Sequence, residues 1–366
     1  MPHLATPEAT RAYAARFEGT AAPGHFRERG GLALSSLGIG TYLGQPDAAT
    51  DRGYTEAVVE AALGGINVID SAINYRMQRS ERSVGAALTE LAARGVPREA
   101  LLLCTKGGYL TPDGAMPANT REYFSREYFS KGILQPAEIA AGCHAMTPRY
   151  LEDQLARSLR NLGAEAVDVY YVHNPETQLE EVPPQEFRAR LRAAFEFLEG
   201  AAAAGKIGAY GLATWNGFRQ PAGSAALHSL ADVVEVAREV AGAAHHFGYV
   251  QLPVNLMMPE AVVLPNQLVG GRELPLLAAA ADLGVAVMAS ASTLQGRLAR
   301  GLPPALAATI GLANDFERAL QFARSAPGLT TALVGMSRPE HARANLRLVA
   351  ESPMSSEQFW SLFRES

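Results

Sequence analysis

The 366-residue chain is short of several features that mark whole classes of protein. It has two cysteines, Cys104 and Cys143, too few for a disulfide framework, which favours a reducing compartment. It has no run of about 18 or more apolar residues, so no membrane span is expected. The first residues, MPHLATPEATRAYAARF, lack a basic segment followed by an apolar one, so no secretory signal is expected. The sequence therefore predicts a cytoplasmic protein.

Positive charge is also scarce. The chain has 32 Lys and Arg against 37 Asp and Glu, a net charge of −5, which provides no electrostatic footprint for a nucleic acid. The pairs Cys143–His144 and His245–His246 have no further ligating residue at a useful spacing, so no metal site is expected. These absences leave a small molecule as the expected partner.

A strand–helix rhythm runs from about residue 31 to the end of the chain, after a leader (residues 1–30) with one short helix expected over Thr6–Phe17. Short apolar runs are predicted as buried strands at Leu37–Tyr42, Ile66–Ser71, Leu101–Lys106, Val167–His173, Ile207–Ala213, Tyr249–Val254, Val285–Ala289 and Thr331–Gly335. Amphipathic stretches between them are predicted as helices at Thr55–Leu63, Ser80–Arg94, Pro148–Leu162, Phe187–Ala204, Ala225–Ala243 and Leu274–Leu283. This alternation predicts an α/β fold, a (β/α)8 TIM barrel over residues 31–366.

One interval, residues 108–147, interrupts the rhythm with an insertion after the third strand. It contains the tandem pentapeptide REYFSREYFS and many aromatic residues. Long loops inside a compact domain are often functional. Two interpretations stay open: a surface segment with its own small core, or a lid over a site. The C-terminal aromatic residues Phe359, Trp360 and Phe363 are expected to help close that site.

Three predicted strands end on ionisable residues, and this is the most informative pattern in the sequence. The run INVIDSAINY carries Asp70 and Tyr75, LLLCTK ends on Lys106, and VDVYYVH ends on His173. Catalytic residues of strand–helix barrels lie at the C-terminal ends of strands. We therefore expect these four side chains to form one site.

The four side chains suit proton transfer to a carbonyl oxygen. A tyrosine hydroxyl titrates near ~10 on its own. An adjacent ammonium lowers that pKa, and a carboxylate keeps the ammonium charged. A histidine at the same place can hydrogen-bond the carbonyl or relay a proton. Because none of the four is a source of electrons, the sequence predicts a nicotinamide cofactor that delivers a hydride.

The same residues carry a family likeness. The sequence resembles the aldo-keto reductases from about Phe26 to Val349, through RERGGLALSSLGIGTYLG, the D-x-A-x-x-Y motif DSAINY, the following S-E-x-x-x-G, CTKGG and VDVYYVHNPE. The resemblance implies a (β/α)8 barrel that binds NAD(P)H without a Rossmann domain. It also implies that Tyr75 is the proton donor, that Lys106 lowers its pKa, that Asp70 pairs with Lys106, and that His173 orients the carbonyl.

The resemblance also implies a set of cofactor-binding residues: Thr41, Tyr42, Asp70, Thr214, Gln251, Ser290, Ala291, Gly335, Ser337, Arg338, His341 and Asn345. Three positions depart from the family pattern. Ser290 stands where an aromatic residue stacks on the nicotinamide, Ala213-Thr214 replaces Ser-Asn, and Gly335 replaces a lysine. The segment from Ser337 to Asn345 favours NADP, and NAD stays an alternative.

These observations predict an NADP-dependent oxidoreductase that interconverts an aldehyde or ketone and the corresponding alcohol. The departures at Ser290 and Ala213 keep a second hypothesis open, a catalytically weak NADP-binding barrel that acts as a redox sensor. A third reading is a barrel isomerase or aldolase in which Lys106 forms a Schiff base.

Overall fold

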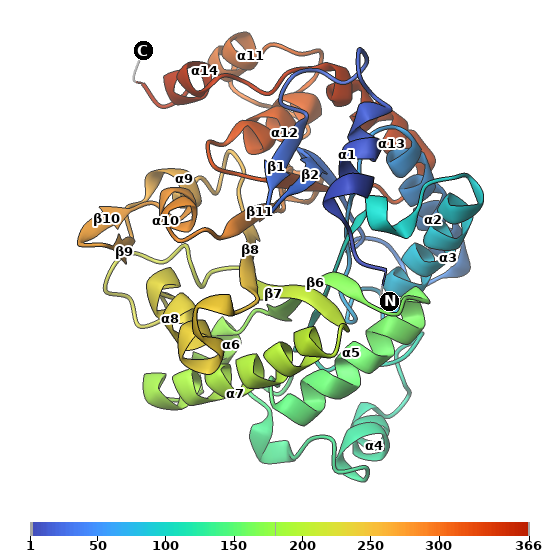
Figure 1. Ribbon diagram of the computed structural model, residues 1–366, viewed down its shortest axis with the longest axis vertical. Coiled ribbons are helices and arrows are strands. Elements are labelled where there is room, and N and C mark those ends of the chain that lie inside the picture. The colour runs from blue at the N-terminus through green and yellow to red at the C-terminus, as the bar shows by residue number, and fades with distance from the viewer. Residues whose placement is uncertain (1–2, 180, 365–366) are drawn as a thin grey trace.

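The computed structural model describes residues 3–179 and 181–364 and shows parallel strands closed into a barrel with helices around it (Figure 1). The barrel strands are β3 (Leu37–Gly40), β4 (Val68–Asp70), β5 (Leu102–Gly107), β6 (Val167–His173), β7 (Ile207–Ala213), β8 (Phe247–Pro253), β11 (Ala286–Ser290) and β12 (Thr331–Gly335). They pair in this order, and β12 closes the barrel on β3. The predicted (β/α)8 TIM barrel is confirmed, and every predicted strand overlaps one of these strands.

Helices follow the strands as predicted from the amphipathic stretches. Around the barrel lie α2 (Ala48–Leu63), α3 (Arg79–Ala93), α5 (Pro148–Leu162), α7 (Pro184–Ala203), α8 (Leu230–Ala241), α10 (Leu276–Asp282), α12 (Asp315–Ser325) and α13 (Pro339–Leu346). In α5 the leucines at 151, 155 and 162 are buried on one face. Gly163 ends α5 in the left-handed conformation, with φ +60°. None of the predicted helix ranges covers α12 or α13.

The first residues pack against the N-terminal end of the barrel. They form α1 (Pro7–Ala15) and an antiparallel hairpin of β1 (Phe26–Arg29) and β2 (Leu32–Ser35). Leu34 of β2 is fully buried in the cluster that fills the barrel interior. The predicted boundary at residue 30 falls in the turn of this hairpin, and the division into leader and barrel domain stays a prediction. Residues 1–2 and 365–366 of that division lie outside the described residues.

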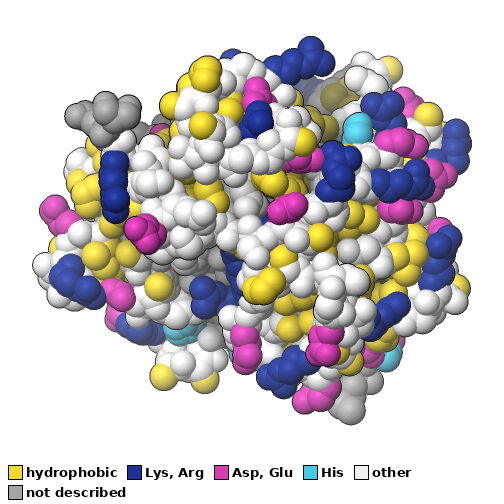
Figure 2. Space-filling model, turned by 90° about the horizontal axis from the view of Figure 1, so that it is seen from above, with side chains coloured by type: hydrophobic (Ala, Val, Ile, Leu, Met, Phe, Trp, Pro, Cys, Tyr) yellow, Lys and Arg dark blue, Asp and Glu magenta, His cyan; other side chains and the backbone are white. Residues whose placement is uncertain are grey.

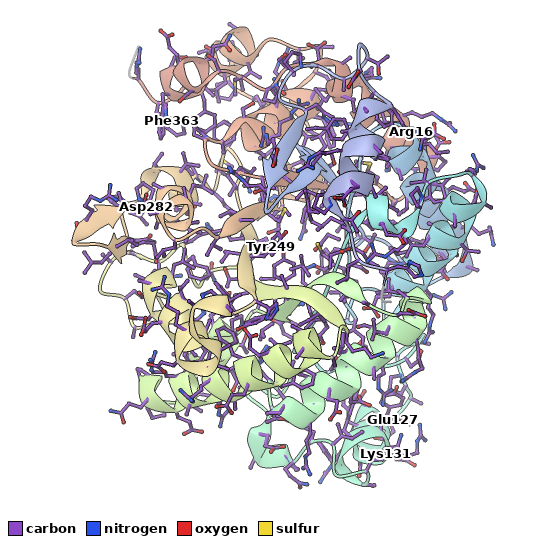
Figure 3. All side chains as sticks on the ribbon, viewed as in Figure 1. Arg16, Glu127, Lys131, Tyr249, Asp282 and Phe363 are labelled. Atoms are coloured by element: carbon purple, nitrogen blue, oxygen red, sulfur yellow. The ribbon has the colours of Figure 1, made fainter. Side chains whose placement is uncertain are left out.

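Residues 108–147 lie between β5 and α5, and their helical middle part lies at the outer edge of the molecule, where Figure 1 labels α4. They contain α4 (Thr120–Phe124) and a π-helical turn (Ser125–Phe129). The segment has a small core of its own, formed with α5: Tyr128, Leu134, Ala145 and Tyr150 are buried, with Phe124, Phe129 and Ile139 packed on them. Glu127 and Lys131 of this segment form an ion pair at 3.0 Å. In Figure 3 the pair lies at the edge of the molecule, whereas Tyr249 of β8 lies near the middle. The segment thus has a small core of its own, while Tyr109 near its start lines the cavity described below, and the lid interpretation stays a prediction.

The remaining elements cover the periphery. They are α6 (Glu176–Leu179), α9 (Glu260–Val263), the hairpin of β9 (Gln267–Val269) and β10 (Arg272–Leu274), α11 (Pro304–Ile310) and α14 (Ser356–Ser361). Phe359 of α14 is buried against Phe322 of α12, with ring centroids 5.1 Å apart. The expectation that Phe359, Trp360 and Phe363 close the pocket is therefore wrong, because these residues pack over α12 instead and none of them lines the cavity described below.

Acidic and basic side chains are interspersed over the face seen in Figure 2, with hydrophobic side chains between them. No helix among the described residues is long and apolar enough to cross a membrane. The described part of the chain also holds no group of His, Cys, Asp and Glu side chains arranged to bind a metal ion.

Candidate active site

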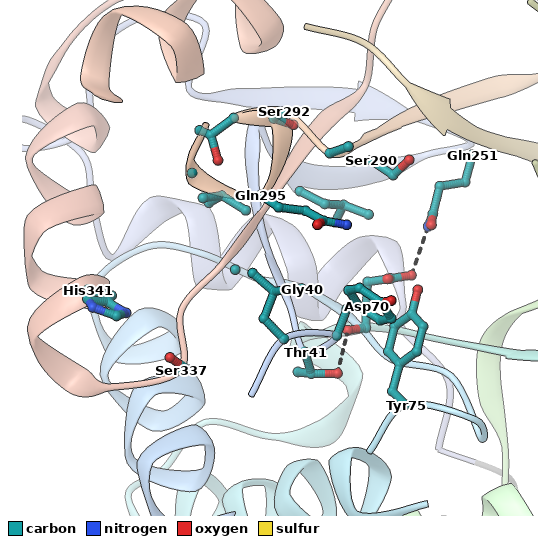
Figure 4. A pocket seen from close by; sticks show the side chains of 18 of the residues that line it. Gly40, Thr41, Asp70, Tyr75, Gln251, Ser290, Ser292, Gln295, Ser337 and His341 are labelled. Carbon is teal, nitrogen blue, oxygen red and sulfur yellow. Dashed lines mark hydrogen bonds between the residues drawn. The ribbon is translucent and has the colours of Figure 1, made fainter. Parts of the chain in front are cut away.

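A cavity of about 730 Å³ opens at the C-terminal ends of the barrel strands. Residues in or shortly after the barrel strands line it, among them Thr41, Tyr75, His173 and Gln251. In Figure 4 the labelled residues spread from Tyr75 and Asp70 at one end to Ser337 and His341 at the other. The cavity is therefore elongated, and it lies where barrel enzymes place their chemistry.

A buried ion pair lies beneath the Tyr75 end of the cavity. The Lys106 ammonium donates to Oδ2 of Asp70 at 2.6 Å and to the carbonyl oxygen of Ser71 at 2.7 Å. Oδ1 of Asp70 accepts a hydrogen bond from Nε2 of Gln251 at 2.8 Å (Figure 4). Lys106 has no exposed surface, and its Nζ lies 4.8 Å from the centroid of the Tyr75 ring. The structure thus brings Asp70, Tyr75 and Lys106 together.

Burial and charge act in opposite directions on this group. Burial is the largest effect on Tyr75 and leaves the pKa of its hydroxyl raised, while Lys106 lowers that pKa in part. Burial by itself lowers the pKa of Lys106, but Asp70 and Tyr75 outweigh it, so the pKa of the ammonium is raised. Both groups therefore keep their protons at neutral pH, and the lowering influence that was expected from Lys106 is present but does not dominate.

His173 ends β6 beside Tyr75, with ring centroids 5.8 Å apart. Burial, followed by Lys106 and His144, holds the pKa of His173 well below its usual value, so its imidazole is neutral. Nδ1 of His173 is buried and has no hydrogen-bond partner among the described residues. The backbone of His173 is held by His144, whose Nε2 lies 2.7 Å from the His173 carbonyl oxygen. His144 is in turn held by Gln178, which donates to its Nδ1 at 2.9 Å.

The backbone after Tyr75 is unusual. Arg76, Met77 and Gln78 have φ values of +49°, +56° and +69°, a run of left-handed residues without glycine. Such conformations cost free energy and persist where the surroundings hold them. Here the buried Arg76 guanidinium pairs with Asp51 of α2. This ion pair anchors the turn that presents Tyr75 to the cavity.

The structure places most of the predicted cofactor residues on the cavity wall. Thr41, Tyr42, Asp70, Thr214, Gln251, Ser290, Ala291, Gly335, Ser337, His341 and Asn345 all line it. Arg338 does not line the cavity; it is the exposed residue that precedes α13, and its guanidinium lies 3.3 Å from Nε2 of His341. The predicted lysine Lys106 lies below the wall instead of on it.

Sequence reasoning missed several lining residues: Tyr54, Asn74, Tyr109, Asn174, Trp215, Ser292, Thr293, Gln295, Asn314, Phe316, Glu317 and Arg347. Tyr109 is the one residue of the 108–147 segment among them. Glu317 of α12 pairs with Arg347 at 2.5 Å, although the two are 30 positions apart. Asn174 could have been suspected, because it directly follows His173 in the motif.

The fold defines a (β/α)8 barrel protein with an elongated cavity above the carboxyl ends of its strands. The model of the Aldo/keto reductase family matches residues 36–229, more than half of the sequence. The chain belongs to the aldo/keto reductase family.

Two relatives are similar to this chain in sequence, and a solved structure is similar to it in fold. The NADH-specific methylglyoxal reductase of Escherichia coli (strain K12) is 28% identical over 187 residues, which are 50% of this chain and 49% of that protein. The D-threo-aldose 1-dehydrogenase of a Pseudomonas species is 28% identical over 184 residues, 50% of each protein. The chain thus spans about half the length of the curated relatives it matches. An aldo/keto reductase from Klebsiella pneumoniae in complex with NADP and acetate has the same fold, with a TM-score of 0.58, 19% identity, and coverage of 92% of this chain and 95% of that one.

Proposed function

We propose that the protein interconverts an aldehyde or ketone and the corresponding alcohol with the help of a nicotinamide dinucleotide. The observation that carries this proposal is the position of Tyr75, which lines the cavity beside the buried Lys106–Asp70 pair. This arrangement suits a general acid, because a nearby ammonium stabilises the tyrosinate that forms when Tyr75 donates its proton.

The lining residues fit a nicotinamide dinucleotide. The hydroxyl Oγ1 of Thr214 is buried, lines the cavity near Gln251, and has no hydrogen-bond partner among the described residues. A carboxamide is a group that would satisfy it. Away from Tyr75 the wall offers neutral hydrogen-bonding groups, including Ser292, Gln295 and Ser337, over a length that suits an extended ligand.

Ser337, His341 and Asn345 support NADP, as do the Klebsiella pneumoniae complex and the sequence motif. The name of the Escherichia coli relative shows that a family member can use NADH instead. We therefore infer NADP as the cofactor of this chain, with NAD as the alternative.

The residues near Tyr75 divide the work of proton transfer. Tyr75 gives its hydroxyl proton to the carbonyl oxygen as negative charge develops there. The Lys106 ammonium stabilises the tyrosinate that results, and Asp70 keeps that ammonium charged and in place. His173 is neutral, so it can donate a hydrogen bond to the carbonyl oxygen without repelling Lys106.

When bound, a reduced nicotinamide would supply the hydride that the carbonyl carbon accepts and would be oxidised in doing so. With the proton from Tyr75 the balance is one carbonyl, one hydride and one proton to one alcohol. Solvent returns the proton to Tyr75 after the product has left. In the reverse direction the alcohol proton passes to a tyrosinate at the same position.

The variant Tyr75→Phe tests the proposal. It is expected to lower kcat by at least about 100-fold, the scale of general acid catalysis, while the dissociation constant of NADPH, measured by fluorescence titration, stays within about twofold because the hydroxyl does not hold the cofactor. Tyr123→Phe, a half-buried tyrosine of α4 outside the cavity, is the matched control and should keep full activity. Full activity in Tyr75→Phe would refute the assignment.

The redox-sensor hypothesis predicts a different result. Ser290 lines the cavity without an aromatic face, which favours weak cofactor stacking. A sensor would hold NADPH and show no oxidation of it in a stopped-flow experiment with a panel of aldehydes, in the native chain and in Tyr75→Phe alike.

A further inference from the structure

The segment between β5 and α5 reaches the active site through His144. This side chain is fully buried, and it is not among the residues that line the cavity. Nε2 of His144 lies 2.7 Å from the carbonyl oxygen of His173, the last residue of β6. A side chain outside the cavity thus contacts the backbone of the histidine that is proposed to bind the substrate carbonyl.

A chain of hydrogen bonds determines which nitrogen of His144 carries the proton. An arginine can only donate, so Oε1 of Gln178 is the atom that faces Arg190 of α7, at 2.5 Å. The amide nitrogen of Gln178 then faces Nδ1 of His144, at 2.9 Å. Burial lowers the pKa of His144 to about 4, so the ring is neutral at pH 7. Because Nδ1 accepts, the proton of this neutral ring is on Nε2, which donates it to the carbonyl of His173.

Tyr109, near the start of the same segment, packs on the ring of His173. The Tyr109 ring lies edge to face with the rings of His173 and His144, with centroids 5.1 and 5.4 Å away. The Tyr109 hydroxyl accepts a hydrogen bond from Nδ2 of Asn174 at 2.9 Å. The backbones of Tyr109 and His144 pair in an isolated antiparallel bridge. The two ends of the segment are therefore joined beside His173, one against its ring and the other at its carbonyl.

The chain leaves β6 in a conformation that needs support. Asn174 has φ +46°, in the left-handed region that costs free energy for residues other than glycine. Its backbone N–H donates to the carbonyl of Ala213 in β7 at 2.6 Å, while the carbonyl of His173 accepts from His144. Nδ1 of His173 has no hydrogen-bond partner among the described residues. Packing and the backbone, and not a hydrogen bond on Nδ1, therefore determine where the imidazole lies.

We propose that His144 is a positioning residue: the hydrogen bond from its Nε2 holds the backbone of His173 so that the imidazole meets the substrate carbonyl oxygen. The inference rests on the proposed function and extends it to a group outside the cavity. Its effect on the rate can be large, because a displacement of a catalytic group by about 1 Å can lower a rate about 100-fold.

The first test separates positioning from folding. His144→Leu removes both ring nitrogens, whereas His144→Gln keeps one donor and one acceptor. We expect His144→Leu to lower kcat, counted per NADPH-binding site, by at least about tenfold and to leave the dissociation constant of NADPH within about twofold. His144→Gln should recover most of that loss. His246→Leu is the matched control, because His246 is exposed and pairs with Glu199 outside the cavity. Native kcat per site in His144→Leu, or equal losses in both His144 variants, would overturn the inference.

The second test reverses the relay and leaves His144 in place. Gln178→Glu keeps an oxygen for Arg190 but places a carboxylate oxygen at Nδ1 of His144, which raises the pKa of His144 and requires a proton on Nδ1. The charged ring still donates to His173, but the neutral ring, with its proton on Nδ1, does not. The kcat of Gln178→Glu relative to the native chain should therefore fall as the pH rises from about 5 to about 9. The control Gln178→Leu should show no such fall. A constant ratio in Gln178→Glu would refute the relay.

The third test needs no turnover. Two-bond 1H–15N NMR spectra of histidine-labelled protein distinguish protonated from unprotonated ring nitrogens, and the His144 signals are identified by their loss in His144→Gln. At pH 7 Nδ1 of His144 should be unprotonated, and the ring signals of His173 should shift in His144→Leu. A proton on Nδ1, or unchanged His173 signals, would overturn the inference even in an active enzyme. A native chain that shows the expected spectra but reduces no aldehyde would count against the proposed function instead.

Discussion

The buried Lys106–Asp70 pair gives the sharpest prediction about stability. In Lys106→Met the ammonium disappears while the Asp70 carboxylate stays in place with a side-chain exposure of 5%. Its remaining side-chain partner is Gln251, which donates one neutral hydrogen bond at 2.8 Å. Removing one partner of a buried ion pair costs about 3–5 kcal/mol, because the other charge is left uncompensated. We expect a loss of that size in the free energy of unfolding.

The companion variant Asp70→Asn tests whether the loss comes from the pair itself. It leaves the ammonium without its carboxylate, so it should also be destabilising. The double variant replaces both charges by neutral groups and leaves nothing uncompensated. Its loss should therefore be smaller than the sum of the single losses by at least about 1 kcal/mol, the scale of coupling between residues in contact.

Urea unfolding at pH 7 and 25 °C, followed by circular dichroism, measures all four proteins of the cycle. Thermal scans should agree, since a loss of 3–5 kcal/mol in a chain of this length lowers Tm by about 4–7 °C. Additive losses would refute the reasoning, as would a Lys106→Met variant as stable as the native chain. Either result would mean that Asp70 is not charged or not paired in the folded protein.

Three further predictions concern the surroundings of the site. Burial lowers the pKa of His144 from its usual 6.5 to about 4, so between these pH values the unfolded chain binds one more proton than the folded chain. The contribution of His144 to the free energy of unfolding is complete above pH 6.5 and falls by about 3 kcal/mol as the pH drops towards 4. Urea unfolding at a series of pH values should show a shallower fall in stability in His144→Gln. Gly108→Ala should destabilise by at least about 1 kcal/mol, because Gly108 has φ +144° and an added Cβ would lie 2.7 Å from Nε2 of His144; the control Gly200→Ala, in α7 with open space around it, should be neutral or stabilising in the same unfolding assay. Oε1 of Glu176 accepts the backbone N–H groups of Trp215 (2.7 Å) and Asn216 (3.0 Å), and Trp215 lines the cavity. Glu176→Gln is therefore expected to raise KM for the carbonyl substrate several-fold and to leave kcat within about twofold; equal changes in both would contradict a positioning role for Glu176.

The barrel could be predicted from the sequence because each buried parallel strand is a short apolar run. The bounds of β6, β7 and β12 agree with the predicted runs. For β4 the run Ile66–Ser71 was longer than the strand Val68–Asp70. At the start of the strand Asn67 contacts the N-terminal hairpin instead, because its side chain accepts from the backbone N–H of Ser35 (2.8 Å) and donates to the carbonyl of Ala33 (2.9 Å). This contact with the N-terminal hairpin has no counterpart in the local pattern.

Part of the candidate site could likewise be predicted from the sequence, and part of it could not. Asp70, Tyr75, Lys106 and His173 could be found because ionisable residues stand out at the ends of apolar runs. Glu317 and Arg347 were missed, because they approach each other only through the packing of α12 against the segment after α13. Asn74 and Trp215 were missed because polar and aromatic residues in loops are ordinary, and only burial and shared cavity lining distinguish them.

The position of Lys106 follows from strand register. Asp70 of β4 pairs with Cys104 of β5, and Cys104 is buried in the cluster inside the barrel. Side chains alternate along a strand, so Lys106, two residues further on, faces the same interior. An ammonium there stays charged only beside a carboxylate, and the neighbouring strand supplies Asp70 at 2.6 Å. A shift of one residue would turn Lys106 towards the helices and leave Asp70 unpaired. The register of β4 and β5 therefore places the Lys106–Asp70 pair beneath Tyr75. A variant that destabilises the fold by breaking this pair should also lower the activity that depends on Tyr75.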